Sequence, residues 1–318
     1  MTDRPLIALT GATGFVGKIL VADLARGGWP VRALARAAPG RTLPSLDRVE
    51  WISGDLASDD ALCELVRGAG VVIHLAGATK AKDAATFHEI NAARTGDLVS
   101  RAQAAGVSHF VHVSSLTALR PEVSAYARSK ASSENLAIRN AGSMALTIVR
   151  APAVLGPEDD ATRALFSALA RGILPSPGGA AADYRFSMID VMDASRCLLG
   201  YAAAPASGVR SVAPAGHLNL SWHDVARSAE RVLQRPVRRI VMPPLLMKVA
   251  GHAADLAVKL NGPPQVFSGG KVKELLSGDW LADTQIQDAI PLDETLKRCI
   301  APFQRSARKT NEYGKRRA

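Results

Sequence analysis

Cysteine is scarce in this chain of 318 residues, which has three: Cys63, Cys197 and Cys299. They show neither the pairing of a disulfide scaffold nor the spacing of a zinc motif, so no metal site is predicted and a reducing compartment is favoured. No apolar run approaches the ~20 residues that cross a bilayer. The N-terminal MTDRP leads directly into a strand-like LIALT, without the layout of a signal peptide.

Acidic residues are also in the minority, with 29 Asp and Glu against 39 Lys and Arg, a formal net charge of +10. Residues 305–318 carry six of these cations and a single acid. Since no aromatic stripe or nucleic-acid motif accompanies them, we predict a basic, disordered tail and no nucleic-acid partner. An anionic membrane surface is the second interpretation of this tail. We therefore expect a cytoplasmic protein, with peripheral attachment to the inner face of the membrane as the alternative.

In the first half of the chain, short apolar runs alternate with segments of helix length. Strands are predicted at 5–10, 31–35, 49–52, 70–76, 109–114 and 145–150, and helices at 15–27, 84–105 and 124–141. Buried strands separated by helices form a parallel sheet that is covered on both faces. Because crossovers are right-handed, the sheet is doubly wound. We predict an α/β fold with a Rossmann domain over residues 1–150.

After Arg150 the alternation loosens, and proline and glycine cluster at 172–179. Helix-like stretches near 160–171, 221–234 and 245–260 predict a smaller, mostly helical substrate lobe over residues 151–304. The segment 184–194 is interpreted as a return to the main sheet, so a returning segment near 184–200 is assigned to the Rossmann domain.

A glycine-rich turn follows the first predicted strand. Gly11 permits the tight turn, Gly14 lets the backbone approach a pyrophosphate, and Gly17 lets the helix pack closely on the strand. Backbone N–H groups at the positive end of that helix face the phosphates. The turn predicts a dinucleotide site formed by Gly11, Thr13, Gly14, Phe15, Val16 and Gly17.

The end of the second strand favours NADP(H) over NAD(H). Enzymes that use NAD place an acidic residue near this point for the ribose 2′-hydroxyl. Here residues 31–36 read VRALAR, and no acid occurs before Asp47. Arg36 is the predicted clamp for a 2′-phosphate, because a guanidinium binds phosphate bidentately, and Arg41 is a second candidate.

Tyr126 and Lys130 lie four residues apart, on one face of a predicted helix. A phenol with a pKa of ~10 is a poor proton donor near neutrality, and an ammonium one turn away lowers that pKa. Ser115, at the end of the fifth strand, supplies a hydroxyl that can orient a carbonyl. Together with the glycine turn, these residues predict hydride transfer to a ketone, with Tyr126 as the proton donor. His74 and His112 lie in strand segments and are expected to be structural.

The chain resembles the extended short-chain dehydrogenase/reductase family over nearly its whole length. The matching segments are TGATGFVG (10–17), GDL (54–56), HLAG (74–77), Asn91, VSS (113–115), YARSK (126–130) and RAPAVLGP (150–157). The resemblance implies that Asp55 and Leu56 border the adenine and that Ala76 and Gly77 lie beside the cofactor ribose.

The same resemblance implies catalytic roles for Asn91, Ser115, Tyr126 and Lys130. Ser115 would orient the substrate, Lys130 would hold the nicotinamide ribose beside Tyr126, and Pro152 would meet the nicotinamide carboxamide. After Asn91, however, the Gly-Thr of the family pattern is replaced by Arg94 and Thr95.

Other departures from the family pattern narrow the substrate. Dehydratases carry an Asp-Glu pair where this chain has Leu116 and Thr117, and nucleotide-sugar enzymes often carry Asn where it has Ala153. These replacements favour reduction of a ketone on an apolar or lipid-like substrate by NADPH. Because the segments HLAGATKA and YARSKA are similar to those of bacterial members of the family, the specific hypothesis is reduction of 3-oxo-ceramide in sphingolipid biosynthesis. Two alternatives stay open: a nucleotide-sugar 4-epimerase with bound NAD, and a non-catalytic NADPH-binding accessory subunit of a membrane complex.

A predicted helix over 245–260 is amphipathic. Lys248, His252, Asp255 and Lys259 share one face, and Leu246, Val249, Ala253, Leu256, Ala257 and Leu260 fall on the other. The helix is interpreted either as packed on the substrate lobe by its apolar face or as lying on an anionic membrane surface. A homodimer is a further open expectation.

Overall fold

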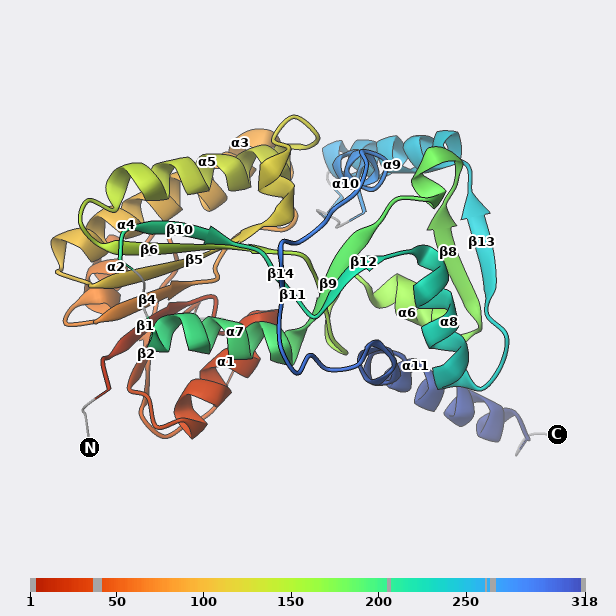
Figure 1. The fold of residues 1–318 in the computed structure, drawn as a ribbon, viewed down its shortest axis with the longest axis horizontal. Coiled ribbons are helices and arrows are strands. Elements are labelled where there is room, and N and C mark those ends of the chain that lie inside the picture. The colour runs from red at the N-terminus through yellow and green to blue at the C-terminus, as the bar shows by residue number, and fades with distance from the viewer. Residues whose placement is uncertain (1–3, 37–41, 205–206, 261, 264–266, 316–318) are drawn as a thin grey trace. The chain divides into compact units, whose positions relative to one another are not determined.

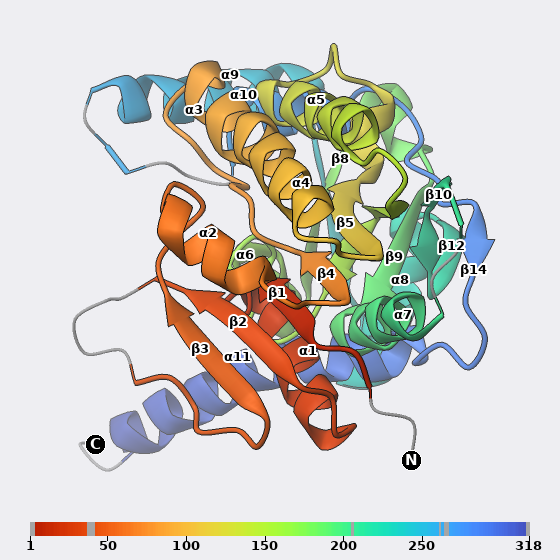
Figure 2. The same cartoon turned by 90° about the vertical axis from the view of Figure 1, so that its left-hand side faces the viewer.

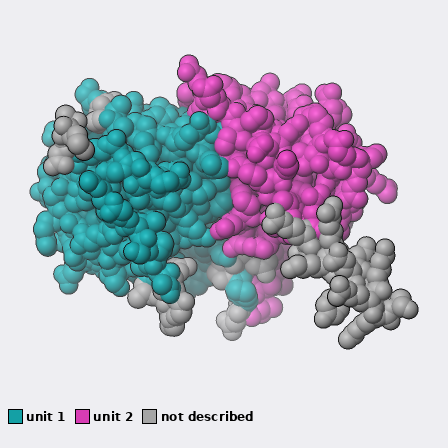
Figure 3. All heavy atoms as spheres, turned by 90° about the horizontal axis from the view of Figure 1, so that it is seen from below, with its two compact units in different colours: residues 1–151, 191–214, 262–265 teal, residues 152–190, 215–261, 266–318 magenta. Residues whose placement is uncertain are grey.

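The computed structural model describes residues 4–36, 42–204, 207–260, 262–263 and 267–315 (Figure 1). The chain divides into two compact units (Figure 3). Unit 1 comprises residues 1–151, 191–214 and 262–265, and unit 2 comprises residues 152–190, 215–261 and 266–318. Each unit is therefore built from separate stretches of the chain.

Unit 1 is built on a seven-stranded parallel sheet in the order β10-β6-β5-β4-β1-β2-β3. In chain order the strands are β1 (Ile7–Thr10), β2 (Val31–Ala35), β3 (Val49–Ser53), β4 (Val71–His74), β5 (His109–Ser115), β6 (Ala145–Ala151) and β10 (Val209–Val212). This arrangement confirms the predicted doubly wound α/β fold.

Helices cover both faces of this sheet (Figure 2). They are α1 (Phe15–Arg26), α2 (Asp59–Val66), α3 (Ala84–His88), α4 (Arg94–Ala104), α5 (Ala125–Asn140) and α7 (Val191–Ala203). Residues of α2, α4 and α5 form one apolar core with the sheet, and residues of α1 and α7 form a second core on the opposite face. Along β1, Ala8 belongs to the first core, whereas Ile7 and Leu9 belong to the second. Because successive side chains enter different cores, the strand is apolar throughout and lacks a polar alternation.

The segment that returns to unit 1 differs from the predicted one. β9 (Phe186–Asp190) pairs with β7 (Ala153–Leu155) and β12 (His217–Leu220) in a three-stranded sheet of unit 2. The elements that return to unit 1 are α7, whose residues 191–200 fall within the predicted segment, and β10, which pairs in parallel with β6. A short apolar run indicates a strand but not its partner, so its sheet is decided by tertiary packing.

Unit 2 combines helices with small sheets. Its helices are α6 (Arg163–Ala170), α8 (Trp222–Leu233), α9 (Pro244–Lys259), α10 (Gly269–Leu275) and α11 (Leu292–Lys315), and its further strands are β8 (Ile173–Pro177), β13 (Arg238–Met242) and β14 (Thr284–Gln285). β11 (Pro214–Ala215) spans the chain boundary between the units, and η3 (Gly179–Ala182) is a 3₁₀ turn. α6, α8 and α11 share an apolar core that includes Phe166, Val225 and Ile300.

The C-terminal helix is longer than predicted. The structure continues α11 through Lys315, where the sequence predicts a disordered tail from residue 305. Arg, Lys, Ala and Glu in this segment have good helix propensity, and glycine first occurs at Gly314. Within the described part of the chain, no helix combines the length and the apolar character that crossing a membrane requires.

Candidate active site

Parallel strands of unit 1 end at the predicted site residue Ser115 and at two further polar residues. Ser115 ends β5, His74 ends β4 and Thr10 ends β1, and β1 pairs directly with β4. The chain connections reverse between these two strands, since β2 and β3 follow on one side and β5 and β6 on the other. In sheets of this class, ligands bind at the carboxyl ends of the strands beside such a reversal.

The glycine turn between β1 and α1 fits a dinucleotide. Gly11 has a φ of +73°, and a Cβ there would lie 2.8 Å from the backbone nitrogen of Ala76. A Cβ at Gly17 would lie 2.0 Å from the carbonyl oxygen of Gly11, so the helix can approach the turn only with glycine at this position. α1 starts at the N-cap Gly14 with no side-chain hydrogen bond to that cap and no acidic residue in its first turn.

The N–H groups of Phe15, Val16 and Gly17 point out of this helix end, because N–H groups in the first turn of a helix have no carbonyl acceptor within the helix. With the positive end of the helix dipole, they are suited to the pyrophosphate of NAD(P), and this role stays a prediction. Thr13 lies in the same turn, as predicted.

The arginines near β2 have different surroundings. Arg32 donates from Nε to the Glu50 carboxylate at 2.8 Å and from Nη1 to the carbonyl oxygens of Glu64 and Arg67, both at 2.8 Å. Arg32 therefore ties β2 to β3 and to the end of α2. Arg36, directly after β2, is exposed and makes no hydrogen bond or ion pair with the described residues. Arg41 lies outside the described residues.

The predicted adenine segment forms a tight turn after β3. The Asp55 carboxylate accepts hydrogen bonds from the N–H of Ala57 at 2.9 Å and from the Ser58 hydroxyl at 3.1 Å. Leu56 is partly buried against the core of α2, α4 and α5. Asp55 thus shapes the turn that leads into α2, and the adenine contacts of Asp55 and Leu56 stay predictions.

A buried chain of hydrogen bonds joins the glycine turn to the helical side of the site. The N–H of Ala76 donates to Thr10 Oγ1 at 3.2 Å, and Thr10 Oγ1 lies 2.7 Å from His74 Nδ1. His74 Nε2 lies 2.9 Å from Thr95 Oγ1, which donates to the carbonyl oxygen of Asn91 at 2.8 Å. Because the Thr95 hydroxyl proton is used in this way, the proton of neutral His74 must be on Nε2. Burial lowers the pKa of His74 to about 3, so the histidine is structural at neutral pH.

Asn91 holds the β4–α3 loop against α5. It lies in η1 (Glu89–Ala93), a π-helical turn that interrupts the helix predicted over 84–105. Its Oδ1 accepts from the N–H of Ala78 at 2.6 Å, and its Nδ2 donates to the Ala78 carbonyl at 3.0 Å and to Ser129 Oγ at 2.9 Å. Ser129 in turn donates to the carbonyl oxygen of Tyr126 at 2.7 Å. A Cβ at Gly77 would lie 3.0 Å from Asn91 Oδ1, which explains the glycine beside it.

Tyr126 and Lys130 are one turn apart on α5, as predicted. Tyr126 is half-buried, and its ring lies edge-on to Phe87 of α3 at a centroid distance of 5.9 Å. Lys130 is buried and donates from Nζ to the carbonyl oxygen of Val113 at 2.8 Å, two residues before Ser115. Burial lowers the pKa of Lys130 to about 8, and the nearby Glu134 carboxylate opposes that shift. The ammonium form therefore predominates at neutral pH.

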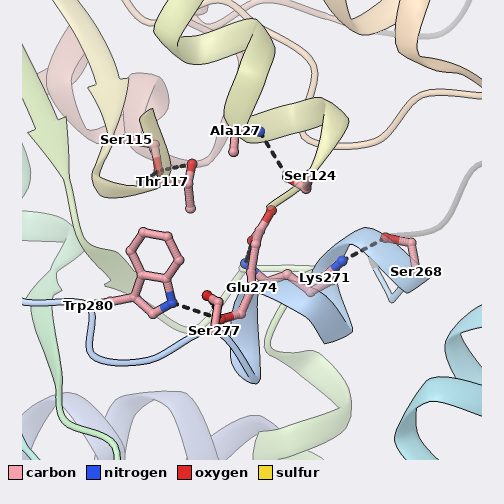
Figure 4. Close-up of polar contacts among 9 residues, drawn as sticks. All are labelled: Ser115, Thr117, Ser124, Ala127, Ser268, Lys271, Glu274, Ser277 and Trp280. Atoms are coloured by element: carbon pink, nitrogen blue, oxygen red, sulfur yellow. Dashed lines mark hydrogen bonds and ion pairs between the residues drawn. The ribbon is translucent and has the colours of Figure 1, made fainter. Parts of the chain in front are cut away.

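Ser115 caps η2 (Leu116–Leu119), a 3₁₀ turn directly after β5 (Figure 4). Its Oγ accepts from the N–H of Thr117 at 3.2 Å and from Thr117 Oγ1 at 3.0 Å. Both bonds use Ser115 as the acceptor, so the Ser115 hydroxyl keeps its own proton as a donor, and its contact with a substrate stays a prediction. Ser124 begins α5 in the same manner by accepting from the N–H of Ala127 at 2.9 Å.

Two supporting groups were not predicted from the sequence. Glu134 lies one turn beyond Lys130 and accepts from Ser114 Oγ at 2.6 Å and from Arg150 Nη2 at 2.7 Å. These bonds tie α5 to β5 and β6. The four-residue spacing of Tyr126, Lys130 and Glu134 could have revealed this residue, whereas nothing in the sequence singles out Ser129 as the partner of Asn91. Pro152 is the first residue of unit 2, and its contact with the nicotinamide stays a prediction.

Comparison with known proteins identifies the family. Residues 7–210 match the NAD dependent epimerase/dehydratase family. The chain belongs to this family. It is 38% identical to the ceramide reductase of Caulobacter vibrioides (strain NA1000 / CB15N) over 278 residues, which are 87% of this chain and 86% of that protein.

Solved structures show the same fold. The crystal structure of gox2253 has a TM-score of 0.74 at 19% identity and covers 96% of this chain and 99% of its own. MoeE5 in complex with UDP-glucuronic acid and NAD has a TM-score of 0.66 at 21% identity, with 95% of this chain and 99% of its own covered. These structures show the fold alone. The family match and the 38% identity with a reductase make the chain an NAD(P)-dependent oxidoreductase of the epimerase/dehydratase family.

Proposed function

We propose that this oxidoreductase uses NADPH to reduce a ketone on an apolar, lipid-like substrate, and that this ketone is the 3-oxo group of an oxidised ceramide. The observation that carries the proposal is the 38% identity with a ceramide reductase over nearly the full length of both chains. The site is compatible with it, because Ser115, Tyr126 and Lys130 are the residue types that carbonyl reduction requires.

The preference for NADPH rests on the surroundings of β2. No acidic residue lies between Val31 and Arg36 to bind a ribose 2′-hydroxyl, and Arg36 has no partner among the described residues. A guanidinium that is not engaged in the fold is available to a 2′-phosphate. Arg32 is excluded from this role by its bonds to Glu50 and to two backbone carbonyls.

The residues of the site then have separate tasks. NADPH, when bound, supplies the hydride for the carbonyl carbon. Ser115 donates its free hydroxyl proton to the carbonyl oxygen and so orients the ketone. Tyr126 transfers its phenolic proton to that oxygen as negative charge develops there. The Lys130 ammonium, fixed by the Val113 carbonyl, favours the phenolate that remains.

The apolar character of the substrate is inferred from what the site lacks. Leu116, which directly follows Ser115, is apolar and buried, and Thr117 uses its hydroxyl on Ser115. Neither residue can remove a proton from a sugar carbon as the acidic pair of a dehydratase does. Ala153 likewise offers no side-chain donor to a nucleotide diphosphate.

The test uses purified protein with NADPH and N-acyl-3-oxo-sphinganine in mixed micelles. The alcohol product, N-acyl-sphinganine (dihydroceramide), is measured by mass spectrometry, and cofactor oxidation is measured by absorbance. Tyr126→Phe should lower kcat by about 10²- to 10⁴-fold, the usual contribution of a general acid, and leave NADPH affinity unchanged. The matched control is Arg128→Ala, which removes an exposed residue of the same helix and should leave turnover unchanged.

Three results would contradict the proposal. The first is an unchanged lipid ketone in the presence of NADPH. The second is interconversion of UDP-sugars by protein that is purified with NAD bound, without net cofactor consumption, which would indicate the nucleotide-sugar epimerase. The third is a Tyr126→Phe variant that retains all function, which would indicate an accessory subunit.

A further inference from the structure

Helix α9 is packed by a different face from the one that its sequence suggests. Met247 and Gly251 are buried, and Ala254, Asp255 and Val258 are partly buried, so these residues form one stripe along the helix. Helix α10 covers this stripe: a Cβ at Gly251 would lie 3.0 Å from Gly269 Cα, and the Asp255 carboxylate accepts from the N–H of Gly269 at 3.1 Å. The small side chains of the stripe allow this close approach.

The opposite side of α9 is apolar and exposed. Leu245, Leu246, Val249 and Leu256, together with Leu260 directly after the helix, have 56–74% of their surface exposed. We call these five residues the α9 face. At 100° per residue they lie within an arc of about 100°. Exposed Ala253 lies within this arc, and exposed Ala250 and Ala257 extend it.

The strand that precedes the helix also exposes apolar side chains. Ile240 and Val241 of β13, the strand that leads into α9 (Figure 1), are 43% and 52% exposed. Soluble proteins rarely expose large apolar side chains in a group such as the α9 face unless the group meets a partner.

The stretch of sequence that contains the α9 face is cationic. Between residues 235 and 275 the sequence has seven Lys and Arg and two acids, Asp255 and Glu274. Asp255 is engaged by the N–H of Gly269, and Glu274 is buried and paired with Lys271 at 2.9 Å (Figure 4). Lys248 and Lys273 are exposed. Both acids are thus engaged within the fold, whereas exposed Lys248 lies on α9 itself, about 60° round the helix from Leu245 at the edge of the α9 face.

We infer that the α9 face docks on an anionic lipid bilayer, with α9 lying in the plane of the interface. An apolar helix face flanked by cations matches such a surface, because leucine and valine enter the acyl boundary while ammonium and guanidinium groups meet the lipid phosphates. A second copy of the chain fits less well, because a two-fold interface pairs the same surface with itself and supplies no anion for the exposed Lys248. The inference goes beyond the catalytic proposal and holds whatever ketone is reduced.

The test is flotation of the full chain with large unilamellar vesicles of phosphatidylcholine containing 30% phosphatidylglycerol, without NADPH or ketone, at 50 mM NaCl. The chain should float with these vesicles and be released at higher salt. Leu246→Ser combined with Leu256→Ser should lower the partition coefficient at least about tenfold, since each leucine loses its burial in the bilayer. Lys248→Gln should lower it about fivefold on anionic vesicles, the usual effect of one cation, and have no effect on pure phosphatidylcholine.

The control variant is Ile138→Ser, which removes a 45% exposed apolar residue from helix α5 of unit 1 and should float as the wild type does. All replaced side chains are exposed, so the variants should fold, and circular dichroism checks this. The inference is overturned if the wild type fails to float at low salt. It is also overturned if the double leucine variant floats like the wild type, which would assign binding to the basic C-terminal residues. Conversion of a dimer into a monomer by that variant, with flotation unchanged, would identify a second copy as the partner of the α9 face.

Discussion

Lowering the pH from 7 to 5 should remove stability from unit 1, because three of its histidines are buried in the uncharged form. Burial lowers the pKa of His74 to about 3 and that of His109 to about 4, and it moves the pKa of His112 well below the ordinary value in the same direction. The His74 and His112 rings stack at a centroid distance of 5.6 Å, and both lie near the Lys130 ammonium, which disfavours a further positive charge.

The sign follows from proton binding. The unfolded chain protonates each histidine near pH 6.5, whereas the folded chain does so only near its lower pKa. The stability is therefore complete above pH 6.5 and declines as the pH falls toward 4 and 3. Each pKa unit is worth about 1.4 kcal/mol, so the 1.5 units between pH 6.5 and 5 cost about 2 kcal/mol for each histidine. His74 and His109 together lose about 4 kcal/mol, a large part of the 5–15 kcal/mol that is usual for a folded domain.

The measurement is urea unfolding at pH 7.0, 6.0 and 5.0 at constant ionic strength, followed by tryptophan fluorescence, since Trp29 is buried in unit 1. At pH 5 most carboxylates are still ionised, so the histidines dominate the change. His74→Asn should reduce the difference in unfolding free energy between pH 7 and pH 5 by about 2 kcal/mol. If His74→Asn fails to fold, His109→Asn serves the same purpose. The control is His88→Gln, which replaces an exposed histidine of α3. Equal wild-type stability at both pH values, or an unchanged difference in the variants, would refute the reasoning.

Three further predictions concern the cofactor turn and α5. Gly17→Ala should destabilise the fold by about 1–3 kcal/mol in thermal denaturation or prevent folding, because its Cβ would lie 2.0 Å from a carbonyl oxygen. The control is Gly200→Ala on α7, where a Cβ meets nothing within 4 Å. This variant should be neutral or stabilising by about 0.5–1 kcal/mol. Arg36→Ala should raise the calorimetric Kd for NADPH about tenfold or more and leave that for NADH unchanged; equal losses would remove Arg36 as the phosphate clamp. Glu134→Gln should lower the pKa of Lys130 further below about 8, because a carboxylate that favours the ammonium is lost, and should shift the alkaline limb of the kcat/KM profile to lower pH. A limb that does not move would contradict that coupling.

The parts of the fold that depend on local pattern were predictable from the sequence. The buried runs at β1, β2, β4, β5 and β6 have no polar alternation, because successive side chains enter apolar cores on both sides of the sheet. The glycine turn was predictable for a steric reason, since Gly11 and Gly17 stand where a Cβ would strike the backbone. Tyr126 and Lys130 were predictable because four residues make one helical turn.

Other features depend on contacts between distant residues, for which the chain carries no local signal. β9 is as apolar as a strand of the main sheet but pairs within unit 2, and the predicted helix over 84–105 contains a π-helical turn in which Asn91 reaches Ala78 and Ser129. Nothing in the sequence distinguishes the role of Arg32 from that of Arg36. In the folded chain, Arg32 is hydrogen-bonded to Glu50 and Arg36 is exposed to solvent.

Helix α9 separates the two kinds of information most clearly. Its sequence by itself determined an amphipathic helix with leucines on one side, because the 3.6-residue period fixes which residues share a face. Which face is buried was decided by the tertiary structure: α10 packs on the small residues around Gly251, where the backbones can approach closely. The larger leucines are left exposed on the other side, because packing against α10 buries the stripe that contains Gly251.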